Sequence, residues 1–302
     1  MQQIPISLLT LVAGILITLF SIWFGQNHGL LPEQASVQAP LVDGFFNIMV
    51  TIATALFVVV EGTIVIFLWK FRYRKGDEGD GLPIEGNLPL EVFWTAIPSI
   101  IVICLGIYSV DVFARMGGLD VHNHTSSHVA QVAQTTLVSS PLDASKTENK
   151  SLIGIGAASD RPNKPVDLTV DVTGMQFAWI FNYPDSGVTA GELHVPVGAE
   201  VQLNLSAKDV IHSFWVPQFR LKQDAIPGVP TQLRFVATKV GTYPIICTEL
   251  CGGYHGSMRS QVIVHTLDEF ESWLEQNRVA QQKPEQVVAV TPAELSSHSQ
   301  KM

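Results

Sequence analysis

Two long apolar stretches limit this chain to a membrane-anchored architecture. Residues 45–69 carry a single charged side chain, Glu61, and residues 92–110 carry none. As a helix, each stretch is long enough to cross the hydrocarbon core of a bilayer, which is about 30 Å thick. A loop rich in Gly, Asp and Pro, residues 76–89, separates them. The sequence therefore predicts a transmembrane α-helical hairpin of two antiparallel spans within residues 26–115.

The charges around the first span predict the orientation of the hairpin. Basic residues follow the span immediately, at Lys70, Arg72, Arg74 and Lys75. Short loops rich in Lys and Arg stay on the cytoplasmic side of a membrane. We therefore expect the connecting loop of the hairpin on the inside and all of the chain after about residue 115 on the outside.

The first 25 residues contain a third apolar run, residues 7–24. Two interpretations remain open, a signal sequence and an additional membrane helix. The run has no Lys or Arg before it and no clear small-x-small cleavage site after it, which weakens the interpretation as a signal peptide.

The second half of the chain has the pattern of a β protein. Residues 167–172 alternate polar and apolar side chains, as a half-buried strand does. Residues 193–198 resemble the strand and turn of cupredoxin sandwiches, so an all-β Greek-key domain is expected over residues 166–265, with His212 at the end of a strand. A polar linker (116–165) is expected before this domain, and a short helix and a tail (266–302) after it.

A cluster of metal-binding side chains lies near the end of the expected β domain. Residues 247–258 contain Cys247, Cys251, His255 and Met258, and His212 lies upstream. Sulfur and imidazole ligands favour copper, and an axial Met is typical of copper electron-transfer sites. The Cys-x3-Cys spacing brings two thiolates close enough to bridge two metals, which predicts a two-copper centre. A disulfide or a zinc site is the alternative, and either leaves Met258 and His212 without a role.

This cluster resembles the binuclear copper centre, CuA, of the cytochrome c oxidase subunit II family. The resemblance implies that Glu249 contributes its backbone carbonyl to copper and its carboxylate to a magnesium or manganese ion shared with subunit I. The implied copper ligands are His212, Cys247, Glu249, Cys251, His255 and Met258.

The resemblance also implies a function. The chain is expected to be the subunit through which electrons enter a proton-pumping cytochrome c oxidase, an oxidoreductase and translocase of the respiratory chain. Electrons then pass to the haem in subunit I, where oxygen is reduced. The membrane is expected to be a bacterial plasma membrane or another energy-transducing membrane, with the copper domain on the periplasmic or lumenal side. Two alternatives are weaker. The related quinol-oxidase subunits have lost the metal ligands, and a stand-alone copper carrier leaves Glu91 and Glu249 unexplained.

Several further residues are assigned by the same resemblance. Residues 174–179 read Gly-Met-Gln-Phe-Ala-Trp, in which Phe177 occupies the place of the usual donor-facing Trp and Trp179 keeps the second aromatic. Phe177 and Trp179 are the expected residues where electrons enter. Asp209 is expected to help dock the donor, which is a soluble c-type cytochrome or plastocyanin.

Glu91 lies at the cytoplasmic start of the second span. The resemblance implies that it marks the entrance of a proton-uptake path into subunit I, whereas its position alone is typical of a carboxylate at a helix start. Glu61 has no counterpart in the motif and is expected to be neutral and hydrogen-bonded to subunit I. The net charge of −9 makes a nucleic-acid partner implausible. The histidines of the linker, His122, His124 and His128, are expected to have no metal-binding role.

Overall fold

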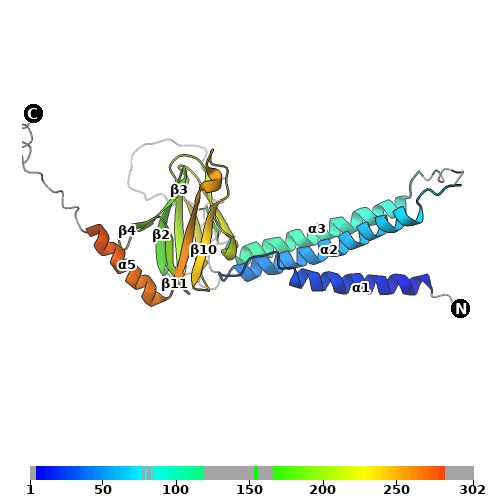
Figure 1. Ribbon diagram of the computed structural model, residues 1–302, viewed down its shortest axis with the longest axis horizontal. Coiled ribbons are helices and arrows are strands. Elements are labelled where there is room, and N and C mark those ends of the chain that lie inside the picture. The colour runs from blue at the N-terminus through cyan, green and yellow to red at the C-terminus, as the bar shows by residue number, and fades with distance from the viewer. Residues whose placement is uncertain are drawn as a thin grey trace, which may run out of the picture.

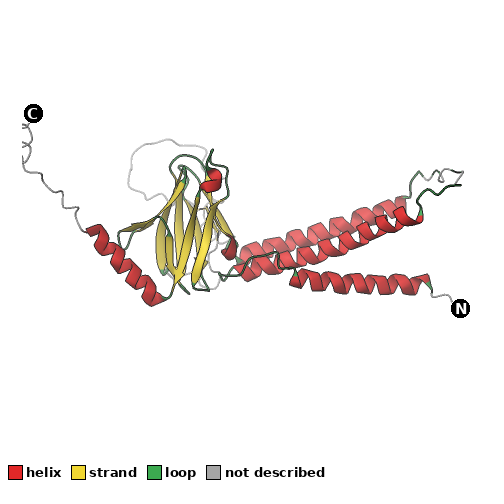
Figure 2. Cartoon of the chain, viewed as in Figure 1, coloured by secondary structure: helices red, strands yellow, loops and turns green. Residues whose placement is uncertain are grey.

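The structure is a computed structural model that describes residues 5–76, 79, 83, 85–118, 153–155 and 166–282. Three long helices lie beside one another at one end, and a β domain lies at the other (Figure 1; Figure 2). The membrane hairpin followed by a cupredoxin-like sandwich is therefore confirmed. The histidines at 122, 124 and 128, most of the expected linker and the chain after residue 282 lie outside the described residues.

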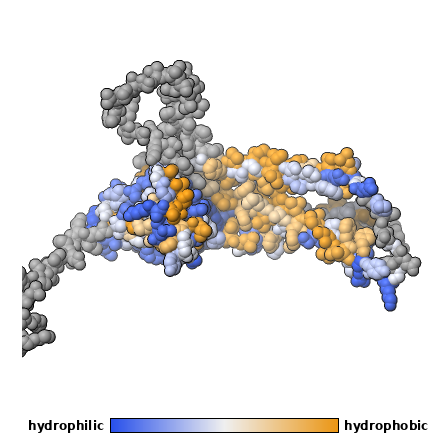
Figure 3. Space-filling model, turned by 90° about the horizontal axis from the view of Figure 1, so that it is seen from above, coloured by the Kyte–Doolittle hydropathy of each residue, from blue (hydrophilic) through white to orange (hydrophobic). Residues whose placement is uncertain are grey.

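The helices are α1 (Ile6–Asn27), α2 (Ala39–Lys70) and α3 (Leu88–Arg115). All three are long and apolar enough to cross a membrane. Their side chains form the apolar belt that Figure 3 shows along the helical end of the molecule. The spans expected at 45–69 and 92–110 lie inside α2 and α3. Both helices begin earlier than the apolar pattern does, and α3 does so because Asn87 caps its first turn by accepting a hydrogen bond from the Leu90 N–H.

Helix α1 packs directly on α2. A Cβ atom at Gly25 would collide with Thr51 Oγ1, so the two backbones approach closely at this glycine. Just beyond, His28 Nε2 lies 2.9 Å from Asn47 Oδ1. These contacts give the apolar run at 7–24 a defined helical partner.

The β domain is a sandwich of two sheets. The first has the strand order β1-β9-β6-β2-β3-β4 and the second β5-β11-β10-β7-β8. The strands are β1 (Ile153–Ile155), β2 (Leu168–Met175), β3 (Ala178–Tyr183), β4 (Val188–Ala190), β5 (Leu193–Pro196), β6 (Glu200–Ala207), β7 (His212–Val216), β8 (Leu221–Ala225), β9 (Thr231–Val236), β10 (Gly241–Cys247) and β11 (Arg259–His265).

Alternate residues of these strands form one core between the sheets. In β2 and β9, for example, every second side chain is buried, among them Val170, Val172, Leu233 and Phe235. This is the alternation that the sequence shows. One detail of the prediction is wrong: His212 begins strand β7 and does not end a strand, because the preceding residues form a loop.

Helix α5 (Leu267–Gln282) follows the sandwich. Thr266 and Glu269 cap it reciprocally. The Thr266 N–H donates to Glu269 Oε2 at 2.9 Å, and the Glu269 N–H donates to Thr266 Oγ1 at 3.4 Å. The helix runs four residues past the end at Arg278 that its amphipathic pattern predicts.

The segment between α1 and α2 enters the β domain. We call residues 32–38 the strap. The Ala35 N–H donates to the Gln218 carbonyl, and the Val37 N–H donates to the Val236 carbonyl at 3.1 Å. Ala35 is fully buried in the sandwich core. The strap therefore adds backbone hydrogen bonds and a core side chain to a domain that begins more than a hundred residues later.

An ion pair holds the start of α2 against the same domain. The guanidinium of Arg220 donates to both carboxylate oxygens of Asp43, from Nε at 2.7 Å and from an Nη at 3.0 Å. Both side chains are almost fully buried. Such a bidentate pair fixes orientation as well as distance, so the hairpin and the sandwich are joined in one defined geometry.

Candidate metal centre

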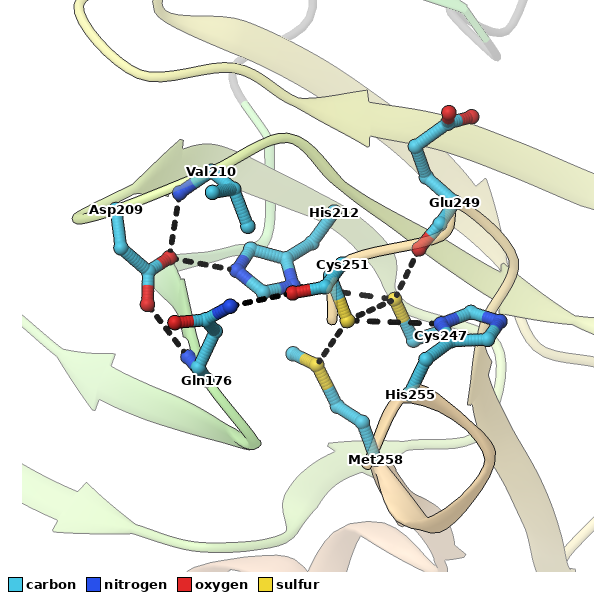
Figure 4. Close-up of polar contacts among 9 residues, drawn as sticks. All are labelled: Gln176, Asp209, Val210, His212, Cys247, Glu249, Cys251, His255 and Met258. Atoms are coloured by element: carbon cyan, nitrogen blue, oxygen red, sulfur yellow. Dashed lines mark hydrogen bonds and ion pairs between the residues drawn. The ribbon is translucent and has the colours of Figure 1, made fainter. Parts of the chain in front are cut away.

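The predicted ligands gather at one end of the sandwich (Figure 4). Strand β7 begins with His212, and strand β10 ends with Cys247. Cys251, His255 and Met258 follow in the loop between β10 and β11, which we call the metal loop (residues 248–258). A rigid sheet thus supplies two of the side chains and a short loop supplies the rest.

The two thiols form the middle of the cluster. Their sulfur atoms are 3.9 Å apart, far beyond the S–S bond length of about 2.05 Å, so both cysteines are free. One imidazole lies beside each thiol: His212 Nδ1 is 3.9 Å from Cys247 Sγ, and His255 Nδ1 is 3.5 Å from Cys251 Sγ.

A further donor completes each half. The Glu249 carbonyl oxygen lies 3.4 Å from Cys247 Sγ, and Met258 Sδ lies 3.8 Å from Cys251 Sγ. Each thiol therefore has its own imidazole and its own weak third donor. This paired arrangement fits two metals bridged by two thiolates, and it accounts for Met258 and His212, which a disulfide or a zinc site leaves unused.

Most of the cluster is shielded from water. His212, Met258 and both cysteines are buried, whereas His255 is half-buried. Burial, together with the neighbouring Cys247 thiol, raises the pKa of Cys251 to about 11. The Cys251 thiol therefore stays protonated at neutral pH until a metal displaces the proton. The ligand atoms of His212, Cys247 and Cys251 all lie within 4.8 Å of one another, a group compatible with copper binding.

Asp209 orients His212. Its carboxylate accepts a hydrogen bond from His212 Nε2 at 2.8 Å, and from the N–H groups of Gln176 and Val210, each at 2.7 Å. With Nε2 held in this way, Nδ1 faces Cys247. Burial acts to raise the pKa of Asp209, but the three hydrogen bonds outweigh it and hold that pKa at about 2. The sequence predicts this residue at the donor-docking surface, and the structure places it against His212, one of the predicted ligands.

Gln176 is a residue of the site that the sequence did not reveal. Its Nε2 donates to the Cys251 carbonyl at 2.5 Å and so ties the turn between β2 and β3 to the metal loop. Gly174 belongs to the same stretch. A Cβ there would lie 3.1 Å from both His212 and Trp179, so the backbone must pass close to the site. The Gly-x-Gln pattern is the available signal, since both residues act on the centre from a distant part of the sequence.

Three aromatic side chains lie around the centre. Trp179 is 3% exposed, and its ring centroid is 5.9 Å from that of His212. Phe177 is half-buried and packs edge-to-face on Tyr254 of the metal loop, with 5.5 Å between the ring centroids. Trp179 is thus a core residue beside a ligand, and Phe177 lies nearer the surface.

The two membrane carboxylates are not brought to the metal centre. Glu91 lies in the first turn of α3, where its Oε1 accepts a hydrogen bond from the Asn87 N–H at 3.1 Å. This end of α3 is the one farther from the β domain (Figure 1). Glu61 lies within α2 with its side chain exposed on the described chain.

Comparisons with known proteins match both halves of the chain. The family described as cytochrome C oxidase subunit II, transmembrane domain, matches residues 21–112, and the corresponding periplasmic domain matches residues 188–266. The chain is 62% identical to cytochrome c oxidase subunit 2 of Thermostichus vulcanus, over 94% of this chain and 89% of that protein. It is 46% identical to cytochrome c oxidase subunit 2 of Synechocystis sp., over 100% of this chain and 94% of that protein. The crystal structure of the periplasmic domain of subunit II from Bradyrhizobium japonicum is 33% identical, with a TM-score of 0.37, and the match covers 39% of this chain and 97% of that domain.

Proposed function

The chain belongs to the cytochrome c oxidase subunit II family, and from this premise we propose that its metal loop holds the binuclear copper centre through which electrons enter the oxidase. The observation that carries the proposal is the pairing in the site. Two free thiols lie 3.9 Å apart, each with its own imidazole and its own weaker donor.

The proposed copper ligands are the side chains of His212, Cys247, Cys251, His255 and Met258 and the carbonyl of Glu249. Two coppers held by these residues would supply a one-electron carrier. The protein holds the ligands in place before metal arrives: Asp209 fixes the His212 ring, and Gln176 fixes the Cys251 backbone. Little rearrangement is then needed when the charge of the centre changes.

The direction of the Glu249 carboxylate is the evidence for a second metal site, separate from the copper site, at the subunit border. Its carbonyl points at Cys247 whereas its carboxylate points away from the thiols (Figure 4), and its side chain is exposed. We assign this carboxylate to a magnesium or manganese ion shared with subunit I, the partner that carries the haem and reduces oxygen.

The membrane part supports the remaining assignments. Helix α1 packs on α2 through Gly25 and His28, which supports a retained third span rather than a cleaved signal sequence. Glu91 lies at the end of the hairpin away from the copper domain, on the side that the basic cluster assigns to the cytoplasm. This is the place where a proton-uptake path into subunit I would begin. Phe177 and Trp179 remain the proposed route for electrons from a soluble c-type cytochrome or plastocyanin.

The test counts copper in the full-length chain, purified from membranes in detergent. Two coppers per chain, with electron paramagnetic resonance hyperfine structure shared over both nuclei, are expected. Cys251→Ser should abolish the shared pattern because it removes one bridge, whereas Ser257→Ala on the same loop should leave the pattern unchanged. One copper with a single-nucleus signal would contradict a binuclear centre, and a Cys247–Cys251 disulfide without copper would contradict any metal role.

A further inference from the structure

Tyr254 is the one strongly exposed aromatic side chain among the described residues of the β domain, 166–282. It is 72% exposed, whereas Trp179 is 3% exposed and Phe177 is half-buried. Exposed aromatic side chains on a folded domain are costly to hydrate and are enriched at protein–protein contacts. Neither the core of the sandwich nor the proposed ligand set uses the Tyr254 ring.

The position of Tyr254 connects it directly to the centre. It immediately precedes the proposed ligand His255 and lies three residues after Cys251. Its ring packs edge-to-face on Phe177, 5.5 Å between centroids. The two rings therefore form a continuous aromatic contact between the exposed side of the metal loop and the turn between β2 and β3.

The backbone of the metal loop is built to allow this contact. Gly252 has a φ of +135°. A Cβ atom at this position would lie 2.7 Å from Gln176 Nε2 and 3.2 Å from the Phe177 ring. Only glycine permits both the conformation and the close approach, so the metal loop lies close against the turn between β2 and β3 that contains Phe177.

Exposed apolar side chains directly precede two of the proposed ligands. Leu250 precedes Cys251 and is 81% exposed, and Ile211 precedes His212 and is 44% exposed. Within four sequence positions of the proposed ligand side chains, the exposed charged residues are two bases and two acids: Lys208, Asp209, Glu249 and Arg259. This end of the domain therefore suits a partner that binds through apolar contact more than through charge.

We propose that Tyr254 is the aromatic contact on which the electron-donating carrier docks, so that electrons enter through Tyr254 and Phe177. The partner is a soluble one-electron carrier protein with an apolar surface around its redox group. This inference rests on the proposed function, because it takes the metal loop as the electron acceptor. The donor loses one electron and the copper centre gains it, while Tyr254 supplies contact and is itself neither oxidised nor reduced.

The first experiment measures binding rather than turnover. The assembled oxidase is titrated with zinc-substituted c-type cytochrome, which cannot donate an electron from its ground state, and separately with oxidised plastocyanin, which has no electron to donate. Tyr254→Ser is expected to weaken the binding of the true donor roughly tenfold or more, as truncating a central interface tyrosine does. Tyr254→Phe should bind as the wild type does, because the ring remains. Leu250→Ala, an exposed apolar change on the same loop, is the matched control and is expected to have a smaller effect.

A footprint gives a second readout on the unaltered protein. Tetranitromethane nitrates exposed tyrosines, and mass spectrometry locates the product. Tyr254 should be nitrated in the free oxidase and protected when the zinc-substituted cytochrome or plastocyanin is bound. Unchanged nitration with both carriers bound, or unchanged affinity in Tyr254→Ser, would overturn the proposal.

Copper content and the electron paramagnetic resonance spectrum separate this inference from the proposed function. Both should be unchanged in Tyr254→Ser, because no ligand is altered. Two variants compare the roles of the two rings. If donor binding and electron transfer are normal in Tyr254→Ser but transfer is slow in Phe177→Ala, Phe177 alone is the entry residue and the role of Tyr254 is refuted. A wild-type chain without a binuclear spectrum would instead refute the copper centre itself.

Discussion

At the scale of single residues, a hydrogen bond to Asp209 fixes the orientation of the His212 imidazole. His212 has two ring nitrogens, and the structure assigns them different tasks. Nε2 binds Asp209, and Nδ1 faces Cys247. A carboxylate behind a metal-binding imidazole fixes its tautomer and its direction. Asp209 is thus a positioning residue for His212, in addition to its predicted role in docking the donor.

Replacing Asp209 by Asn tests this role. The amide keeps the size of the side chain but removes the charge that holds the His212 Nε2 proton, so copper affinity is expected to fall roughly 10–100-fold. Competition with a copper chelator measures the affinity, and the hyperfine pattern reports the ligand geometry. Asp185→Asn, at an exposed position between β3 and β4, is the control and should change neither. A normal affinity and spectrum in Asp209→Asn would leave Asp209 with only its predicted docking role.

The sequence predicts which proposed ligands lie close together far better than it predicts the residues that support them. Cys247, Cys251, His255 and Met258 lie within twelve residues, so their spacing alone brings them together. Gln176 contacts Cys251 across 75 positions of the chain, and Asp209 meets Gln176 across 33. Those contacts depend on which strands pair in the sandwich, and strand pairing is not encoded by local spacing.

At the scale of elements, the docking of α5 depends on stacked rings. The buried His194 ring lies nearly parallel to the Trp273 ring of α5, 3.9 Å between centroids, and its Nδ1 is 2.8 Å from His265 Nε2. Tyr183 holds the His194 backbone on both sides, because its hydroxyl donates to the His194 carbonyl and accepts from the His194 N–H.

Acid is expected to weaken this docking. Burial, together with the neighbouring His265, lowers the pKa of His194 from 6.5 to about 4. Between these values the unfolded chain binds the proton and the folded chain does not. The free energy of unfolding therefore falls as the pH drops from 6.5 towards 4. Glu192 lies 3.9 Å from His194 Nε2, and Glu269 interacts with His265, but neither prevents the downward shift in pKa.

Denaturant unfolding of the detergent-solubilised chain, followed by tryptophan fluorescence at several pH values, measures the effect. His194→Phe keeps a stacking ring and removes the titrating group, so the fall in stability over this window should become shallower. An identical pH dependence in the wild type and in His194→Phe would show that His194 does not contribute.

The helices show which features of elements the sequence predicts well. Residues 45–69 and 92–110 are recognised by their apolar composition, which depends on no distant contact. The start of α3 depends on the Asn87 cap, and α2 begins directly after the strap, where the Ala39 N–H donates to Ser36 Oγ, so hydropathy misses both starts. The strands are recognised by alternation, but the start of β7 at His212 depends on its pairing with Ala225 of β8.

At the scale of the whole molecule, the buried Asp43–Arg220 pair joins the membrane hairpin to the β domain, beside the strap. Both side chains are nearly inaccessible to water. A buried ion pair that loses one partner leaves an uncompensated charge, which is far more costly than losing an exposed pair. An exposed pair, Glu33 and Lys239, lies at the same junction, with more than half of each side chain accessible.

Two matched changes at this junction test the difference. Asp43→Asn is expected to lower the free energy of unfolding by about 3 kcal/mol or more, because Arg220 stays buried and charged. Glu33→Gln removes the exposed pair and is expected to lower it by about 1 kcal/mol or less. Denaturant unfolding of the full chain measures both. If Asp43→Asn lowers the free energy of unfolding no more than Glu33→Gln does, the buried ion pair contributes no more to the junction than the exposed pair.

The strap also determines when the β domain can finish folding. The Ser36 hydroxyl donates to the Phe219 carbonyl, a contact that spans 183 positions of the chain. A ribosome therefore synthesises the strap and the whole membrane hairpin long before the strands that close around the strap. The strap must already have been translocated, together with its flanking helices, when the sandwich folds. The β domain thus completes its core only at the membrane surface, so membrane insertion becomes a precondition for a finished electron-transfer domain.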